Sequence, residues 1–110
     1  MNSTGEICPW SHLEPSTLEW CERRLCAWIS EPANTWSNII FIVVGILILI
    51  ECRKRNLGSI KLLGAFSILL GFMSGFYHAT ASLIGELVDF SSMFLISVFL
   101  ISANYARVKK

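Results

Sequence analysis

Three polar side chains near the end of an apolar stretch are the best candidates for chemistry in this sequence: Ser74, His78 and Asp89. Ser74 and His78 are four residues apart, so on a helix they share one face and lie one turn apart. Asp89 follows eleven residues after His78, at the start of the next apolar run. Because burying such groups in hydrocarbon is costly, together they predict a functional site. A histidine can bind zinc, and a carboxylate can transfer protons.

A second group of candidates is acidic and precedes the first apolar run: Glu19, Glu22 and Glu31. Amide and hydroxyl side chains lie close to these carboxylates in the sequence, within the twenty residues 19–38. A hard cation such as calcium takes about six to eight oxygen ligands, which this stretch could supply.

Each of these side chains also has an ordinary structural explanation. Glu19 fits the end of a capping box that begins a helix, and Glu31 would complement the dipole of the helix that follows it. His78 could be a hydrogen-bonded residue at a helix end, Asp89 an N-cap, and Ser74 a helix serine bonded to a backbone carbonyl. For each residue considered alone, the spacing leaves both the functional and the structural interpretation open.

The composition indicates which elements must position these residues. The chain has 110 residues, of which 54% are hydrophobic and only 15% are charged, against about 25% charged in soluble domains. Three stretches lack charges and are long enough to cross a bilayer, which takes about 17 to 25 residues. The sequence therefore predicts an all-α, polytopic membrane domain over residues 32–110, with transmembrane helices at about 32–50, 62–82 and 89–106.

Residues 1–31 are expected to form a polar leader that carries the acidic group and a short amphipathic helix. The sequence from Ser16 to Glu19 matches a capping box, and Leu18, Trp20 and Trp28 suit a helix that lies in the membrane interface. Within the second membrane segment, small residues recur every four positions, at 67, 71 and 75. Such a row lets another helix approach closely, so self-association is one expectation.

Basic residues predict the orientation in the membrane. Seven of the nine Lys and Arg residues follow the first membrane segment or end the chain: Arg53, Lys54, Arg55, Lys61, Arg107, Lys109 and Lys110. The positive-inside rule places both groups in the cytoplasm, and therefore places the N-terminus and the turn between His78 and Asp89 outside or in a lumen. The histidine group and the acidic group would then share one membrane face.

Two residue types add further expectations. None of the four cysteines form a C-x-x-C pair, and a disulfide among Cys8, Cys21 and Cys26 is possible if they face an oxidising compartment. His12 is interpreted as an exposed loop residue. No basic patch with interleaved aromatics is visible, so a nucleic-acid partner is not expected.

The order of the motifs resembles the alkaline ceramidase family. Between residues 17 and 93 the chain carries W-C-E at 20–22, E-P-x-N-T-x-S-N at 31–38, S-x-x-x-H-A-T at 74–80 and L-x-D at 87–89. That family belongs to a superfamily of seven-helix membrane hydrolases that also includes the adiponectin and progestin receptors. The resemblance implies hydrolysis of the ceramide amide bond, to a sphingoid base and a fatty acid, by zinc-activated water.

The resemblance also implies roles for individual residues. His78 matches a zinc ligand, Ser74 matches a serine beside the metal, and Asp89 matches an aspartate that takes part in the zinc-site chemistry. The residues that match a calcium site are Glu19, the Trp20 carbonyl, Glu22 and Glu31. Arg24 departs from the pattern, because eukaryotic members have an asparagine there, and an arginine opposes cation binding.

The family takes its other two zinc ligands from an H-x-x-x-H motif in its last helix, whereas the only other histidine here is His12. We therefore expect the N-terminal three-helix portion of a zinc amidohydrolase that acts on ceramide or a related lipid amide. This chain alone should be inactive unless a C-terminal half supplies the remaining helices. The alternative is a non-catalytic small membrane protein or a receptor-like remnant of the same scaffold.

Overall fold

A computed structural model describes residues 5–110, apart from the side chain of Ser59. The helices are α1 (Pro32–Ser37), α2 (Ile39–Arg55), α3 (Lys61–Thr80) and α4 (Leu83–Val108), with a 3-10 turn, η1 (Gly58–Ile60), between α2 and α3. Within the described residues there are no strands, and an isolated bridge pairs Pro15 with Ser82. The predicted all-α fold is confirmed, while the first four residues of the expected leader lie outside the described part.

Three helical segments are long and apolar enough to cross a membrane: Pro32–Arg55, Lys61–Thr80 and Leu83–Val108. Helices α1 and α2 together make the first of them, with an irregular step at Asn38. This segment extends five residues beyond its predicted end at residue 50. Its last turn holds Arg53, Lys54 and Arg55, whose positive charges complement the negative end of the helix dipole.

The third membrane segment begins six residues earlier than predicted. Ser82 is the N-cap of α4, because its hydroxyl accepts a hydrogen bond from the Gly85 N–H at 3.2 Å. Ala81, in the left-handed conformation with φ 49°, connects α3 directly to Ser82. Asp89 therefore lies in the second turn of α4, and the interpretation of Asp89 as a helix cap is wrong.

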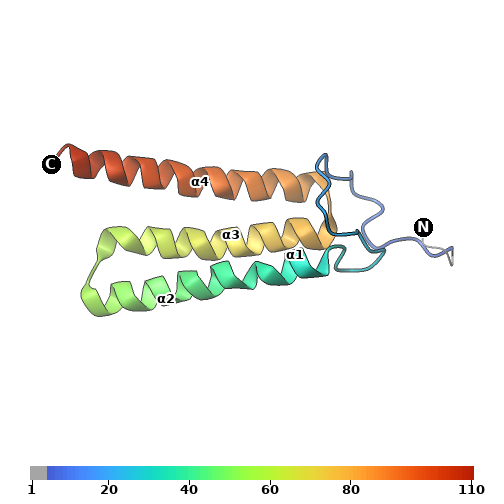
Figure 1. The fold of residues 1–110 in the computed structure, drawn as a ribbon, viewed down its shortest axis with the longest axis horizontal. Coiled ribbons are helices and arrows are strands. Elements are labelled where there is room, and N and C mark those ends of the chain that lie inside the picture. The colour runs from blue at the N-terminus through green and yellow to red at the C-terminus, as the bar shows by residue number, and fades with distance from the viewer. Residues whose placement is uncertain (1–4) are drawn as a thin grey trace.

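Helix α3 lies between α2 and α4 (Figure 1), and within residues 5–110 the two outer helices do not contact each other. The row of small residues on α3 faces α2. Ser67 donates a hydrogen bond to the Phe41 carbonyl at 2.8 Å, and a Cβ added at Gly71 would lie 3.0 Å from the Asn38 carbonyl oxygen. Gly75 is more open, with nothing within 3.8 Å of such a Cβ. Because α2 covers this row, the row no longer argues for self-association.

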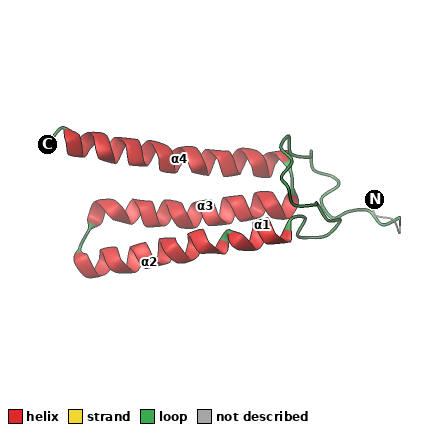
Figure 2. Ribbon diagram, in the orientation of Figure 1, coloured by secondary structure: helices red, strands yellow, loops and turns green. Residues whose placement is uncertain are grey.

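The predicted interfacial helix between Ser16 and Trp28 is wrong. This stretch is irregular and lies across the ends of the helices (Figure 2). Its backbone bonds to other elements, since the Ser16 N–H donates to the Ala81 carbonyl at 3.0 Å and the Thr17 N–H donates to the Glu86 carboxylate at 2.6 Å. Helices shorter than about 12 to 15 residues are marginal alone, so these tertiary bonds outweigh the local capping signal.

A disulfide joins Cys8 to Cys26 and closes this N-terminal segment into a loop. Cys21 is an exposed thiol, and Cys52 is buried near the end of α2. His12 is exposed, as expected from the sequence. The loop thus covers the end of the helices at which His78 and Asp89 lie.

Candidate functional site

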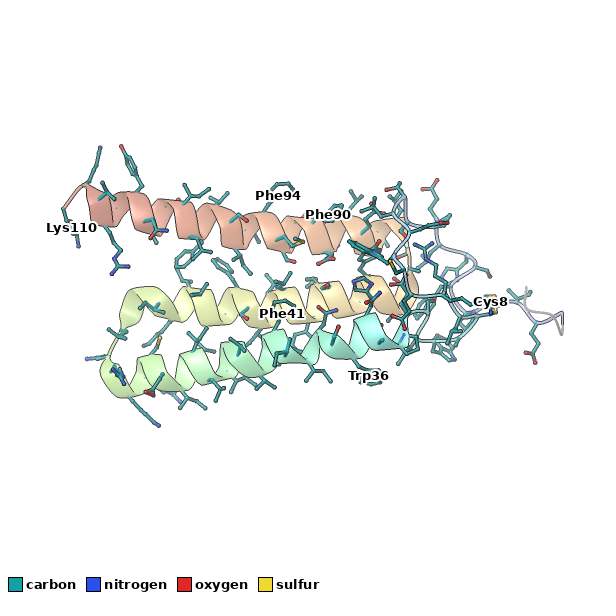
Figure 3. All side chains as sticks on the ribbon, in the orientation of Figure 1. Cys8, Trp36, Phe41, Phe90, Phe94 and Lys110 are labelled. Carbon is teal, nitrogen blue, oxygen red and sulfur yellow. A yellow bond between two sulfur atoms is a disulfide. The ribbon has the colours of Figure 1, made fainter. Side chains whose placement is uncertain are left out.

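Polar side chains are concentrated where the N-terminal segment meets the helices. Figure 3 shows nitrogen and oxygen atoms crowded at this end, whereas Trp36 and Phe94 point away from the helices and Lys110 marks the opposite end. We call the following set the polar cluster: Arg24, Glu31, Ser74, Tyr77, His78, Glu86 and Asp89.

The backbone of the N-terminal segment brings Glu31 to His78. The last turn of any α-helix has carbonyl groups without partners inside the helix. At the end of α3, the Ser30 N–H donates to the Ala79 carbonyl at 2.9 Å, and the Glu31 N–H donates to the His78 carbonyl at 3.1 Å. The same bonds that satisfy α3 therefore fix Glu31, which is only 1% exposed.

His78 is held in one ring orientation by its surroundings. Its Nδ1 lies 2.6 Å from the Glu31 carboxylate. Because an ionised carboxylate only accepts hydrogen bonds, Nδ1 carries the proton and Nε2 remains available. The rings of Tyr77 and Trp20 lie 4.8 Å and 6.0 Å from the imidazole, measured between centroids. Among the residues that the structure describes, Nε2 has no hydrogen-bond partner, so this arrangement presents one available nitrogen at the end of α3.

Glu31 also accepts hydrogen bonds from Arg24 Nε at 3.3 Å and from Asn34 Nδ2 at 3.1 Å. Burial raises the pKa of Glu31, but the hydrogen bonds from Asn34, His78 and Arg24 lower that pKa by more, so it lies below its ordinary value. Glu31 is therefore ionised at neutral pH and can hold the Nδ1 proton of His78.

Asp89 faces the same region from α4. It is 5% exposed, and its Oδ1 has no hydrogen-bond partner among the described atoms. Ser74, which is 8% exposed, and His78 lie near this carboxylate. A buried, partly unsatisfied carboxylate is destabilising, so its presence calls for an explanation such as a ligand or a proton.

Two members of the polar cluster were missed by the sequence analysis. Tyr77 is 1% exposed, and its hydroxyl accepts a hydrogen bond from the Trp20 indole N–H at 3.0 Å. Glu86, 4% exposed, accepts hydrogen bonds from the Thr17 hydroxyl and N–H, both at 2.6 Å. A carboxylate so close to a membrane segment could have indicated Glu86. Nothing in the sequence indicated Tyr77, because it is adjacent to His78 and adjacent residues on a helix point to different faces.

A family model described as Ceramidase matches residues 12–110. The chain belongs to the ceramidase family. Together with the three membrane-length helices, this membership makes it an integral membrane protein. The motifs that carried the resemblance, from residue 17 to 93, all fall within the matched range.

Curated relatives of this ceramidase-family chain are alkaline ceramidases. The alkaline ceramidase of Drosophila melanogaster is 37% identical over 87 residues, which cover 73% of this chain and 31% of the relative. The alkaline ceramidase of Caenorhabditis elegans is 36% identical over 109 residues, which cover 89% of this chain and 39% of the relative. Alkaline ceramidase 1 of Mus musculus is 27% identical, and the match covers 84% of this chain and 34% of the relative. The chain thus spans between 31% and 39% of the length of these relatives. No solved structure matches it.

The expected residues of this ceramidase-family chain fall into two sets. Ser74, His78 and Asp89 come together, and Glu31 joins them through its contact with His78. The carboxylate of Glu22 instead accepts hydrogen bonds from two backbone N–H groups at the start of α1, each at 2.8 Å.

This arrangement does not fit a calcium ion. Glu19 is exposed, Glu22 is used by the N-terminus of α1, and both oxygens of Glu31 already accept bonds from Arg24, Asn34 and His78. The positive charge of the guanidinium lies where a calcium ion would need further oxygen ligands.

The residues do fit one part of a zinc site. His78 has a free Nε2 and a carboxylate on its other nitrogen, which is the usual environment of a zinc-binding histidine. The unpartnered Asp89 oxygen adds a buried polar atom nearby. Within residues 5–110 no three His, Cys, Asp or Glu side chains are grouped closely enough to hold a metal ion. A complete site therefore requires ligands beyond these.

Proposed function

We propose that this chain provides part of the active site of a zinc-dependent hydrolase that cleaves the amide bond of ceramide or a related lipid amide. The observation that carries the proposal is the 2.6 Å contact between His78 and buried Glu31, at one end of three membrane-length helices. Family membership supports the reaction class, because the curated relatives are named alkaline ceramidases.

Each residue has a role that follows from its surroundings. His78 would bind zinc through Nε2, while Glu31 holds the Nδ1 proton and the ring orientation. Asp89 would accept a proton through its unpartnered oxygen and deliver one to the leaving amine, and Ser74 would orient its carboxylate. Zinc, when bound, polarises a carbonyl and acidifies water. The apolar helix surfaces beside the cluster suit a substrate with long hydrocarbon chains.

Metal binding tests this proposal directly. We expect the His78→Ala variant to lose at least about tenfold in zinc affinity, since it lacks the free imidazole nitrogen. The measurement is equilibrium dialysis of the detergent-solubilised chain followed by elemental analysis. His12→Ala is the matched control, because His12 is exposed in the N-terminal segment and should leave zinc binding unchanged.

Equal zinc affinity in the wild-type chain and the His78→Ala variant would remove the ligand assignment. Fatty-acid release from ceramide should be assayed on the same samples. We expect none from this chain alone, because a catalytic zinc site uses three protein ligands. Zinc binding that depends on His78, without hydrolysis, would fit a partial site, and absence of both would favour a non-catalytic membrane protein.

We further propose that the N-terminal end faces the outside or a lumen and that the C-terminus faces the cytoplasm. The disulfide between Cys8 and Cys26 lies at the same end as the polar cluster and suits an oxidising compartment. The end of α2, the start of α3 and the C-terminus carry most of the basic residues, and they lie together at the opposite end (Figure 1).

Thiol chemistry tests this orientation. In membranes prepared without reductant, alkylation should modify only Cys21 and Cys52 after denaturation, and reduction should expose Cys8 and Cys26 as well. A membrane-impermeant maleimide should label exposed Cys21 on intact cells if this end faces the exterior, or only after the organelle membrane is opened if it faces a lumen. In either case Cys21→Ser should abolish that labelling. An added cysteine at Asn56, between α2 and α3, should react only after permeabilisation. The opposite pattern would reverse the orientation.

A further inference from the structure

Arg24 is surrounded by oxygen atoms of the kinds that bind a hard metal cation. Its Nε contacts the Glu31 carboxylate at 3.3 Å, and its Nη2 donates to the Ser16 hydroxyl and the Leu18 carbonyl, each at 2.5 Å. Carboxylate, hydroxyl and backbone carbonyl oxygens are the ligands that calcium takes in proteins. The guanidinium side chain is 29% exposed, so it is largely inside this ring of oxygens.

The charges of the polar cluster explain why a cation is needed at this point. Glu31 is 1% exposed and Glu86 is 4% exposed, and Arg24 interacts electrostatically with both carboxylates. Burying carboxylates without a compensating charge is strongly unfavourable. Arg23 has the same charge but is exposed, and it makes no described contact with this cluster. Arg24 is therefore the guanidinium that neutralises the two acids.

We infer that Arg24 is a built-in cation that takes the place of a divalent ion among these oxygens and acts as a positioning residue. It fixes Glu31, and Glu31 fixes the Nδ1 proton and ring of His78. The cluster is thus assembled without calcium. The inference rests on the proposed function only for the role given to His78, and the arrangement itself holds for the metal-free chain.

Thermal unfolding with and without calcium tests the cation replacement. The full chain in detergent is unfolded in EDTA or in excess calcium chloride, and tryptophan fluorescence is recorded. The melting temperature of the wild type should be the same in both within about 1 °C. Arg24→Asn should lower it in EDTA by at least about 5 °C, and calcium should restore a substantial part of the loss. Arg23→Asn, the matched control, should show neither effect.

Three results would overturn the inference: a saturable rise of the wild-type melting temperature with calcium, no restoration of Arg24→Asn by calcium, or equal behaviour of the Arg24 and Arg23 variants. If Arg24→Asn does not fold in EDTA, the same melting experiment on Arg24→Lys tests the inference instead. Lysine keeps the charge but loses the planar fork, so a smaller loss that calcium does not restore is expected.

The positioning role has a separate readout in the His78 ring. With ¹⁵N-labelled histidine, the Nδ1 proton of His78 should give a downfield signal in the wild type and in Arg23→Asn. In Arg24→Asn without calcium this signal should shift upfield or broaden, while the His12 signals stay unchanged. An unaltered His78 signal would show that Arg24 does not act through Glu31. Because no zinc is present, this result is independent of zinc binding and hydrolysis.

Discussion

Glu31→Gln is expected to be the most destabilising single change in the polar cluster, costing about 2 to 4 kcal/mol in the free energy of unfolding. The carboxylate is almost fully buried and accepts hydrogen bonds from Arg24, Asn34 and His78. A glutamine there is neutral and presents an NH₂ group, so it leaves the guanidinium of Arg24 without its charge partner. The value is below the full cost of breaking a buried pair because Arg24 is 29% exposed.

The measurement is the melting temperature of the chain in detergent, where we expect a decrease of at least about 10 °C. Two other glutamates that resemble family calcium ligands provide the comparison. Glu19→Gln should be neutral within about 0.5 kcal/mol, because Glu19 is exposed. Glu22→Ala should cost about 1 kcal/mol, since it removes the acceptor for two backbone N–H groups of α1. Equal losses at all three positions would instead indicate one shared cation site.

The sequence predicted the membrane helices well because their length is set by the bilayer and not by tertiary contacts. Three uncharged stretches became the three membrane-length segments, with errors only at their ends. The start of α4 at Leu83 was missed because its N-cap, Ser82, lies within an uncharged stretch, where hydropathy alone does not mark the turn. A helix N-cap depends on a single hydrogen bond, which the composition of the sequence does not reveal.

The N-terminal segment was predicted less well, for a different physical reason. The capping box from Ser16 to Glu19 is a valid local signal, but the N–H groups of Ser16 and Thr17 find partners on Ala81 and Glu86 instead. Those partners are more than sixty residues away in the chain. A local pattern carries no information about such contacts, so tertiary structure overrides it.

The candidate site contains one part that the sequence predicted and one part that only the tertiary structure shows. Ser74 and His78 share a helix face by spacing alone, and both expected clusters were placed on one membrane face by the distribution of charges. The contact between Glu31 and His78 spans 47 residues and depends on the backbone pairing at the end of α3. It joins Glu31 to the histidine group, whereas Glu19 is exposed and Glu22 binds the start of α1, so Glu31 has a role different from the one its motif suggested.

Asp89 gives a test of whether this unit is built for chemistry or for stability. A residue retained for stability should be satisfied by its neighbours, whereas a catalytic residue can be kept at a cost to the fold. Asp89 is 5% exposed with one oxygen unpartnered, while Glu86 on the same helix is 4% exposed with both oxygens bonded to Thr17. Neutralising each carboxylate should therefore change the stability of the chain in opposite directions, so Glu86 is the matched comparison for Asp89.

We expect Asp89→Asn to raise the melting temperature of the metal-free chain by about 4 to 8 °C, corresponding to about 1 kcal/mol, because it removes a buried charge without changing the shape of the side chain. The same variant should lose at least about tenfold in zinc affinity, because we expect the unpartnered Asp89 oxygen to support the zinc site as an outer-shell carboxylate. Glu86→Gln should do the reverse, lowering the melting temperature by breaking its bonds to Thr17 while leaving zinc affinity unchanged. If Asp89→Asn proved as destabilising as Glu86→Gln, Asp89 would be a structural residue. The proton transfer assigned to it would then have to belong to another group.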